Sequence, residues 1–187
     1  GEDFGNLAVE FSEDPSAKEN KGNLGYFSVF RMVYPFESGA YNTPLGTVSK
    51  PVRTRFGYHL IKVNSVRDNR GEVSVSHIML MKSEDKEVNE KNKSRIQEIY
   101  QKLQQGERFE ELAKQFSEDK SSGSNGGKMA NFSSGQLSSE TFENVAFSLT
   151  KEATLSKPFE SDFGWHIVKL NEKFAVKSFE EMEADLQ

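Results

Sequence analysis

The chain has 187 residues, a formal net charge of −5 and 15 phenylalanines. The acidic balance excludes nucleic-acid binding through bulk charge, and the supply of aromatic side chains is too large for a disordered chain. The absence of cysteine excludes disulfides, thiolate nucleophiles and cysteine-bound zinc.

Two motifs occur twice along the chain. GEDFGNLAVEFSED (1–14) matches GERFEELAKQFSED (106–119), and FGYHLIKV (56–63) matches FGWHIVKL (163–170). A repeat period above 100 residues indicates duplicated globular domains rather than a solenoid of short repeats. We therefore predict three segments, namely a first unit over 1–68, a second unit over 69–175, and the start of a carboxy-terminal helix or linker over 176–187.

The first unit is predicted to begin with a short helix, because Phe4, Leu7, Ala8 and Phe11 have helical spacing. In the second unit the alternation of apolar and polar residues predicts a strand over 73–81. The elements expected after it are a long helix through 96–103, a shorter helix at 109–116, a strand near 128–132, a helix around 142–149, and strands near 157–161 and at 164–170. By register with this order, the first unit lacks the first strand and the long helix.

The three histidines fall at only two repeat positions. His59 and His166 are equivalent, and His77 lies in the first predicted strand of the second unit. A histidine in a strand is more often a core or surface residue than a catalytic one. Zinc needs three or four ligands, and the spacing of these residues supplies no such set, so we predict no metal site.

The order of motifs becomes specific when it is taken as a whole. A strand with His-Ile, then F-x-x-L-A-x-x-F-S-x-D, a glycine-rich loop, G-x-L-G-x-F-S and F-G-x-H resembles the parvulin (PpiC-type) peptidyl-prolyl cis/trans isomerases. The resemblance covers residues 73–174 and 1–68, and tandem units resemble SurA-like extracytoplasmic folding factors. It implies an α+β fold with a four-stranded antiparallel sheet and surrounding helices, in one complete and one amino-terminally truncated unit. It also implies a periplasmic or otherwise extracytoplasmic location, with the targeting signal outside this sequence.

The resemblance also implies functional residues. The implied catalytic residues are His77, Asp119, His166 and Ser161, and the implied substrate-binding residues are Met129, Leu137, Phe142 and Phe132. The equivalents in the first unit are Asp14, Leu24, Phe27, Met32, Phe36, Thr54 and His59. From spacing alone, plain core packing is the favoured interpretation of Met129, Leu137 and Phe142, and only the surrounding motif favours a peptide-facing pocket instead.

The implied reaction is isomerisation of prolyl bonds in proline-containing unfolded polypeptides. Amide resonance sets its barrier at about 18–20 kcal/mol, and no covalent bond breaks, so neither metal nor cofactor is required. The loop after the first strand, KSEDKEVNEKNK, has no arginine, which predicts no phosphate-specific recognition.

Two departures from the family pattern leave alternatives open. Ala130 replaces the second glycine of G-x-L-G-x-F, and one extra residue precedes Phe142, which leaves the position of that ring open. The alternative function is a non-catalytic peptide-binding chaperone domain, and a third interpretation is a structural spacer. The sheet edge expected in the truncated unit predicts a possible strand-mediated dimer of this fragment.

Overall fold

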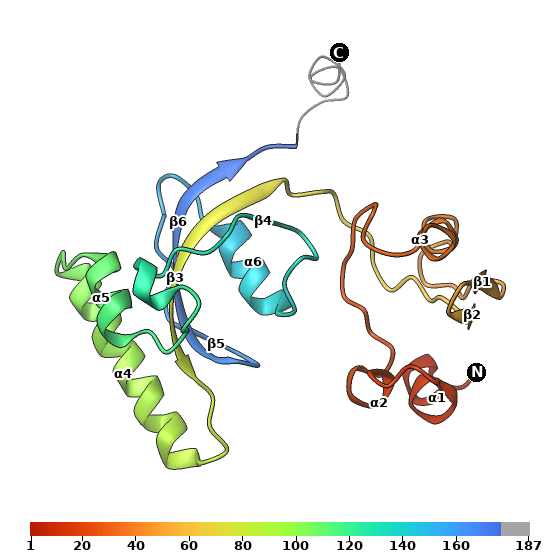
Figure 1. The fold of residues 1–187 in the computed structure, drawn as a ribbon, viewed down its shortest axis with the longest axis horizontal. Coiled ribbons are helices and arrows are strands. Elements are labelled where there is room, and N and C mark those ends of the chain that lie inside the picture. The colour runs from red at the N-terminus through yellow and green to blue at the C-terminus, as the bar shows by residue number, and fades with distance from the viewer. Residues whose placement is uncertain (177–187) are drawn as a thin grey trace. The chain divides into compact units, whose positions relative to one another are not determined.

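The computed structural model describes residues 1–176. The segment predicted as a carboxy-terminal helix or linker lies, from residue 177 onward, outside the described residues. The chain divides into two compact units, unit 1 (Gly1–Asn69) and unit 2 (from Arg70), and each is described by itself (Figure 1). Over the described residues, every helix is too short or too polar to cross a lipid bilayer.

Unit 1 is built from short helices and a small sheet. Its described elements are α1 (Phe4–Phe11), α2 (Ala17–Asn20), α3 (Tyr34–Tyr41), β1 (Val52–Thr54) and β2 (Gly57–His59). The carboxylate of Asp3 accepts the N–H of Asn6 at 2.9 Å, so one amide at the start of α1 is bonded. β1 and β2 form an antiparallel hairpin in which Val52 pairs with His59. The helix predicted from the spacing of Phe4 to Phe11 is confirmed.

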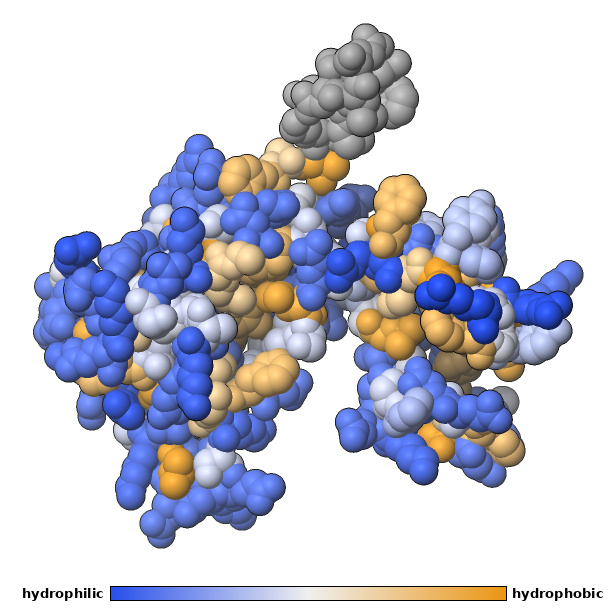
Figure 2. Space-filling model, in the orientation of Figure 1, coloured by the Kyte–Doolittle hydropathy of each residue, from blue (hydrophilic) through white to orange (hydrophobic). Residues whose placement is uncertain are grey.

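Large apolar side chains remain exposed in unit 1. Phe11, Phe30 and Leu60 are 71 %, 94 % and 59 % exposed, and patches of hydrophobic residues are visible on this unit in Figure 2. The counterpart of Leu60 in unit 2 is Ile167, which is fully buried among the side chains of two helices. The two units therefore differ in how much of the equivalent sheet face is covered.

Unit 2 contains the four-stranded antiparallel sheet expected from the sequence. Its elements are β3 (Glu72–Met81), α4 (Lys86–Gln104), α5 (Phe109–Phe116), the 3-10 helix η1 (Gly123–Asn125), β4 (Phe132–Ser133), α6 (Glu140–Ser148), β5 (Phe159–Ser161) and β6 (Gly164–Phe174). The strands lie in the order β4-β3-β6-β5, and every pair is antiparallel. The predicted α+β class is therefore confirmed for this unit.

Alternation along β3 and β6 gives the sheet two apolar faces, because successive side chains point to opposite sides. One face carries Ile78, Leu80 and Ile167, which pack against residues of α4 and α5. The other carries Val75 and Val168, which pack against α6. Figure 1 shows α4 and α5 on one side of the sheet and α6 on the other. The candidate site lies on the α6 side.

One predicted strand is much shorter than expected. The sequence predicts a strand near 128–132, but β4 covers only Phe132 and Ser133. Lys128 forms an isolated bridge with Ser76, and the N–H of Met129 bonds to the carbonyl of Val75 at 3.0 Å. The segment thus contacts β3 at two separate places, and regular pairing is interrupted between them.

Candidate active site

The register of the sheet brings two histidines of distant sequence together. His77 on β3 pairs with Val168, and Met79 pairs with His166 on β6. His77 and His166 are therefore diagonal neighbours on one face of adjacent strands. Their rings stack with centroids 5.9 Å apart and planes 15° apart, and both side chains are buried.

A carboxylate and a hydroxyl hold the imidazole of His77 on its outer side. His77 Nε2 lies 2.7 Å from Asp119 Oδ2 and 3.0 Å from Ser122 Oγ. The hydroxyl of Ser122 also donates to Asp119, as does the hydroxyl of Ser121. Asp119 follows α5 and precedes η1, and its carbonyl accepts the N–H of Gly123 at 2.8 Å. The turn between these helices therefore fixes the carboxylate beside β3.

The second histidine is held by the hairpin between β5 and β6. Ser161 Oγ lies 2.7 Å from His166 Nε2 and accepts the N–H of Phe163 at 3.1 Å. Ser161 is buried behind His166 and does not line the cavity. Through these contacts Ser161 orients the ring of His166. A catalytic role, as predicted, would require direct contact with substrate, and Ser161 has no place on the cavity wall.

Burial makes both histidines neutral at pH 7. It lowers the pKa of His77, although Asp119 partly opposes the decrease, and it lowers the pKa of His166 to about 4. Burial is the largest single influence on Asp119 and acts to raise its pKa. Hydrogen bonds from Ser122, His77 and Ser121 together outweigh that influence, so the pKa of Asp119 is lowered. The site thus holds one carboxylate beside a neutral imidazole pair.

The charge on Asp119 fixes the tautomer of His77. A carboxylate only accepts hydrogen bonds, so Nε2 of the neutral ring carries the proton and Nδ1 carries a lone pair. The Nδ1 atoms of His77 and His166 are buried and have no hydrogen-bond partner among the described residues. The pair therefore presents unpaired ring nitrogens inside the site.

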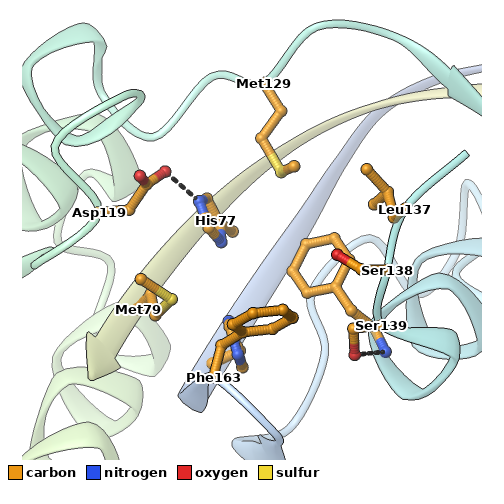
Figure 3. Close-up of a pocket in the computed structure, with 10 residues that line it drawn as sticks. His77, Met79, Asp119, Met129, Leu137, Ser138, Ser139 and Phe163 are labelled. Carbon is orange, nitrogen blue, oxygen red and sulfur yellow. Dashed lines mark hydrogen bonds and ion pairs between the residues drawn. The ribbon is translucent and has the colours of Figure 1, made fainter. Parts of the chain in front are cut away.

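A cavity of about 180 Å³ opens beside the two rings (Figure 3). It is smaller than the ~300–1,000 Å³ of sites for drug-sized ligands, which suits a single ring-sized group. Six predicted residues line it: His77, Asp119, Met129, Leu137, Phe142 and His166. Four further lining residues were not predicted: Met79, Ser138, Ser139 and Phe163. Met79 is two residues after His77, so strand alternation would have found it.

Phe142 stands edge-on to both imidazoles. Its ring centroid is 5.4 Å from that of His77 and 5.4 Å from that of His166, with interplanar angles of 90° and 75°. The ring of Phe142 thus lines the cavity in spite of the extra residue that precedes it. Ala130 is exposed and does not line the cavity.

Phe132 does not occupy the place predicted for it. It is 3 % exposed and packs in the core, where its ring lies 6.3 Å from that of Phe142 and 6.0 Å from that of Phe147. The structure corrects the predicted substrate contact, because Phe142 lies between Phe132 and the histidine pair. Phe132 supports the cavity wall from behind.

Unit 1 repeats one half of this arrangement. Thr54 Oγ1 lies 2.7 Å from His59 Nε2, as Ser161 does from His166. The ring of Phe36 stands edge-on to His59 with centroids 5.3 Å apart, and Phe27 lies 6.2 Å from Phe36. Within residues 1–69, His59 is the only histidine, so no ring pair forms there.

The remaining predicted residues of unit 1 are more open to solvent. Leu24 is 44 % exposed, and Met32 is half-buried. Asp14 accepts the N–H and the hydroxyl of Ser16, and these two bonds lower its pKa. Asp14 thus shares the local turn of Asp119, without a described histidine bonded to it.

Comparisons with known proteins give consistent matches over both units. The PPIC-type PPIASE domain matches residues 77–172, and a second family model of the same description matches residues 1–67. Chaperone SurA of Pseudomonas aeruginosa is 38 % identical over 184 residues, which are 96 % of this chain and 43 % of that protein. Chaperone SurA of Pseudomonas syringae pv. syringae is 36 % identical over 176 residues, with 91 % and 40 % covered.

A solved structure, described as a PpiC-type peptidyl-prolyl cis-trans isomerase domain, is 25 % identical and superposes with a TM-score of 0.51. The superposition covers 57 % of this chain and 94 % of that domain. The chain spans less than half the length of the curated relatives that it matches. The comparison therefore covers nearly all of that isomerase domain, but less than half of each curated relative.

Proposed function

This chain belongs to the PpiC-type peptidyl-prolyl isomerase family, and from that premise we propose that unit 2 catalyses cis/trans isomerisation of prolyl bonds. The substrates in this proposal are proline-containing unfolded polypeptides. The observation that carries it is one small cavity in which the apolar Met129, Leu137 and Phe142 face the buried pair of histidines.

The chemistry of the reaction suits this composition. Amide resonance sets a barrier of about 18–20 kcal/mol, while the two isomers differ by only about 0.5–1 kcal/mol. Apolar walls hold the proline ring and exclude water, which weakens the solvation of the polarised planar amide. Fixed polar groups at the cavity then stabilise the twisted amide more than either planar form. The reaction needs no nucleophile, since no covalent bond is broken.

The neutral histidines supply shape and polarity in this mechanism. Their low pKa values disfavour the charged imidazolium, so neither ring is poised to donate a proton near pH 7. Asp119 fixes the orientation of His77, and Ser161 fixes that of His166. The rings thereby form a rigid floor against which the prolyl bond rotates.

The test is the isomerisation rate of a short cis-prolyl peptide, measured by NMR exchange spectroscopy without a helper protease. We expect catalysis by the whole chain and a clear loss of kcat/KM in Leu137→Ala. Ser148→Ala, on the far end of α6, is the matched control and is expected to keep the rate. A wild-type rate equal to the spontaneous rate would overturn the enzymatic proposal.

A second candidate is a non-catalytic peptide-binding chaperone domain. It is supported by the curated relatives, both of which carry the name Chaperone SurA. Two sequence features motivated this candidate, namely Ala130 and the extra residue before Phe142. Neither now favours it, because Phe142 lines the cavity and Ala130 does not. Peptide binding that weakens in Leu137→Ala, without any catalysed rate, would favour this candidate.

Location and assembly complete the proposal. An extracytoplasmic location is supported by the resemblance to tandem folding factors and is compatible with a chain that has no cysteine. Fractionation of cells that express the protein natively tests it, and recovery in the cytosol alone would contradict it. The strand-mediated dimer of this chain stays a prediction, to be tested by sedimentation velocity across a range of concentrations.

A further inference from the structure

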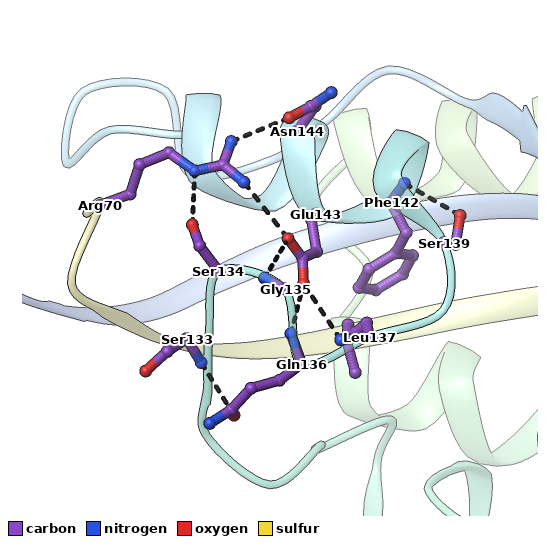
Figure 4. Close-up of polar contacts among 10 residues, drawn as sticks. All are labelled: Arg70, Ser133, Ser134, Gly135, Gln136, Leu137, Ser139, Phe142, Glu143 and Asn144. Carbon is purple, nitrogen blue, oxygen red and sulfur yellow. Dashed lines mark hydrogen bonds and ion pairs between the residues drawn. The ribbon is translucent and has the colours of Figure 1, made fainter. Parts of the chain in front are cut away.

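A buried carboxylate lies directly behind the cavity wall. Glu143 follows Phe142 in α6 and is only 2 % exposed. Its Oε2 accepts the N–H of Gly135 at 2.9 Å, and its Oε1 accepts those of Gln136 and Leu137 at 3.0 Å each (Figure 4). One side chain therefore gathers three successive amides of the loop that precedes α6.

Arg70 compensates the charge of this carboxylate. Its Nη2 lies 3.3 Å from Glu143 Oε2, its Nε donates to Ser134 Oγ at 2.8 Å, and its Nη1 donates to Asn144 Oδ1 at 2.9 Å. The guanidinium also lies 4.3 Å from the ring centroid of Phe147. A buried charge is costly unless it is paired and hydrogen-bonded, and here both conditions are met.

The same contact occurs in unit 1 with a different spacing. Glu37 accepts the N–H of Phe30 at 3.0 Å, that of Arg31 at 2.6 Å and that of Met32 at 2.7 Å. Met32 precedes its glutamate by five residues, whereas Leu137 precedes Glu143 by six. Both carboxylates nevertheless bond the amide of the residue that the repeat assigns to the pocket. The extra residue of unit 2 is thus accommodated between that amide and α6.

The loop conformation is also repeated. Phe30 has φ of 65° and Gly135 has φ of 78°, so both units place a left-handed residue at the first of the three amides. A left-handed conformation costs a residue other than glycine about 1–2 kcal/mol, yet unit 1 has phenylalanine there. The repetition shows that three converging amides are a fixed feature of the fold in both units.

Leu137 and Phe142 lie at the two ends of the segment that Glu143 anchors, and Ser138 and Ser139 between them also line the cavity. An apolar side chain at 143 would fill the same space without the desolvation of a charge. We propose that Glu143 is a positioning residue that sets the distance between Leu137 and Phe142, and with it the affinity of the cavity for a prolyl ring. This inference rests on the function proposed above.

The test is Glu143→Gln in the whole chain. A glutamine amide has one accepting oxygen and a donating NH₂ group, so it cannot accept from all three amides. We expect KM for a cis-prolyl peptide to rise about tenfold, with kcat within about twofold of wild type, since one or two hydrogen bonds to a charge are lost. The backbone ¹⁵N–¹H resonances of Gly135 to Leu137 should shift at the same time.

Glu110→Gln is the matched control, because Glu110 forms an ion pair with Lys169 at 2.7 Å and does not line the cavity. It removes the same charge from unit 2 and is expected to leave KM unchanged. Equal KM values for wild type and Glu143→Gln would overturn the positioning role. So would a rise in KM of the same size in the control.

Two further measurements separate the possible failures. Where Glu143→Gln does not fold, amide hydrogen exchange in wild type decides, because the amides of Gly135 to Leu137 should exchange much more slowly than free loop amides. Exchange at the free rate would contradict the inference. Where the wild type binds a proline peptide but catalyses nothing, the proposed function fails. The positioning role is then tested by Kd, which should also rise about tenfold in Glu143→Gln, and an unchanged Kd would overturn it.

Discussion

Lowering the pH from 7 to 5 is expected to destabilise unit 2 by about 2 kcal/mol, because its fold holds His166 neutral. Burial lowers the pKa of His166 from 6.5 in the unfolded chain to about 4 in the folded one. Between these two values the unfolded state binds more protons. The contribution of neutral His166 to the free energy of unfolding is therefore present in full above pH 6.5. It is lost as the pH decreases toward 4.

The full effect of this one group follows from the same two values. A difference of about 2.5 pKa units corresponds to roughly 3 kcal/mol once the pH is below 4. The pKa of His77 is also lowered by burial, so His77 adds to the loss in the same direction. Asp119 acts in a lower range, because its pKa lies below the ordinary 3.8. The window from pH 7 to 5 therefore reports on the histidines.

Urea unfolding followed by tryptophan fluorescence measures this loss. Trp165 is the single tryptophan of the chain and lies in β6 beside His166, so the signal reports on unit 2. His166→Gln should flatten the pH dependence while keeping a hydrogen-bonding group toward Ser161. His59→Gln in unit 1 is the matched control and should keep the wild-type slope. Equal stability of the wild type at pH 7 and 5 would refute the reasoning, as would an unchanged slope in His166→Gln.

Three further changes test the geometry of the site. Leu137→Ala should lower the free energy of unfolding by less than about 2 kcal/mol, because the side chain is only half-buried. The same variant should weaken peptide binding in an NMR titration. A larger loss of stability than of affinity would contradict this. Gly164→Ala should lower the free energy of unfolding in urea by more than about 4 kcal/mol, since its new Cβ would lie 2.1 Å from a β3 carbonyl oxygen. Gly57→Ala is the control, because the space around Gly57 is open, and it should show only the backbone strain of about 1–3 kcal/mol. Equal costs for the two variants would be inconsistent with the sheet. Asp119→Asn should lower the pKa of His77 further, as followed by its ring protons in NMR, because the carboxylate opposes the effect of burial; a higher pKa would contradict the assigned pair.

Much of the candidate site could be predicted from the repeated motifs. Met129, Leu137 and Phe142 line the cavity, as do His77, Asp119 and His166. Phe132 was placed wrongly, because an aromatic residue in a motif does not reveal which of two neighbouring rings faces the cavity. Glu143 was missed, although the pair Phe-Glu occurs in both units at 36–37 and 142–143.

The reason for these misses is physical. A carboxylate that bonds backbone amides leaves no pattern in hydropathy, since its partners are N–H groups that almost every residue has. In the sequence, a glutamate within α6 is indistinguishable from one that faces solvent, although Glu143 is buried beside Phe142, Ala146 and Phe147. Only the three converging amides show that Glu143 belongs to the cavity wall.

The sequence by itself determined the duplication, most elements of unit 2 and the residue types of its pocket, because periodicity and repeated motifs are local properties. The meeting of His77 with His166 was decided only by the pairing of β3 with β6. The register shifts by one residue between Ser74 and Val75. In the register of Glu72 to Ser74, continued without the shift, His77 would pair with Lys169, and His166 would point to the opposite face. Strand alternation gives the face of each residue within its own strand, and the tertiary pairing alone joins the two faces into one site.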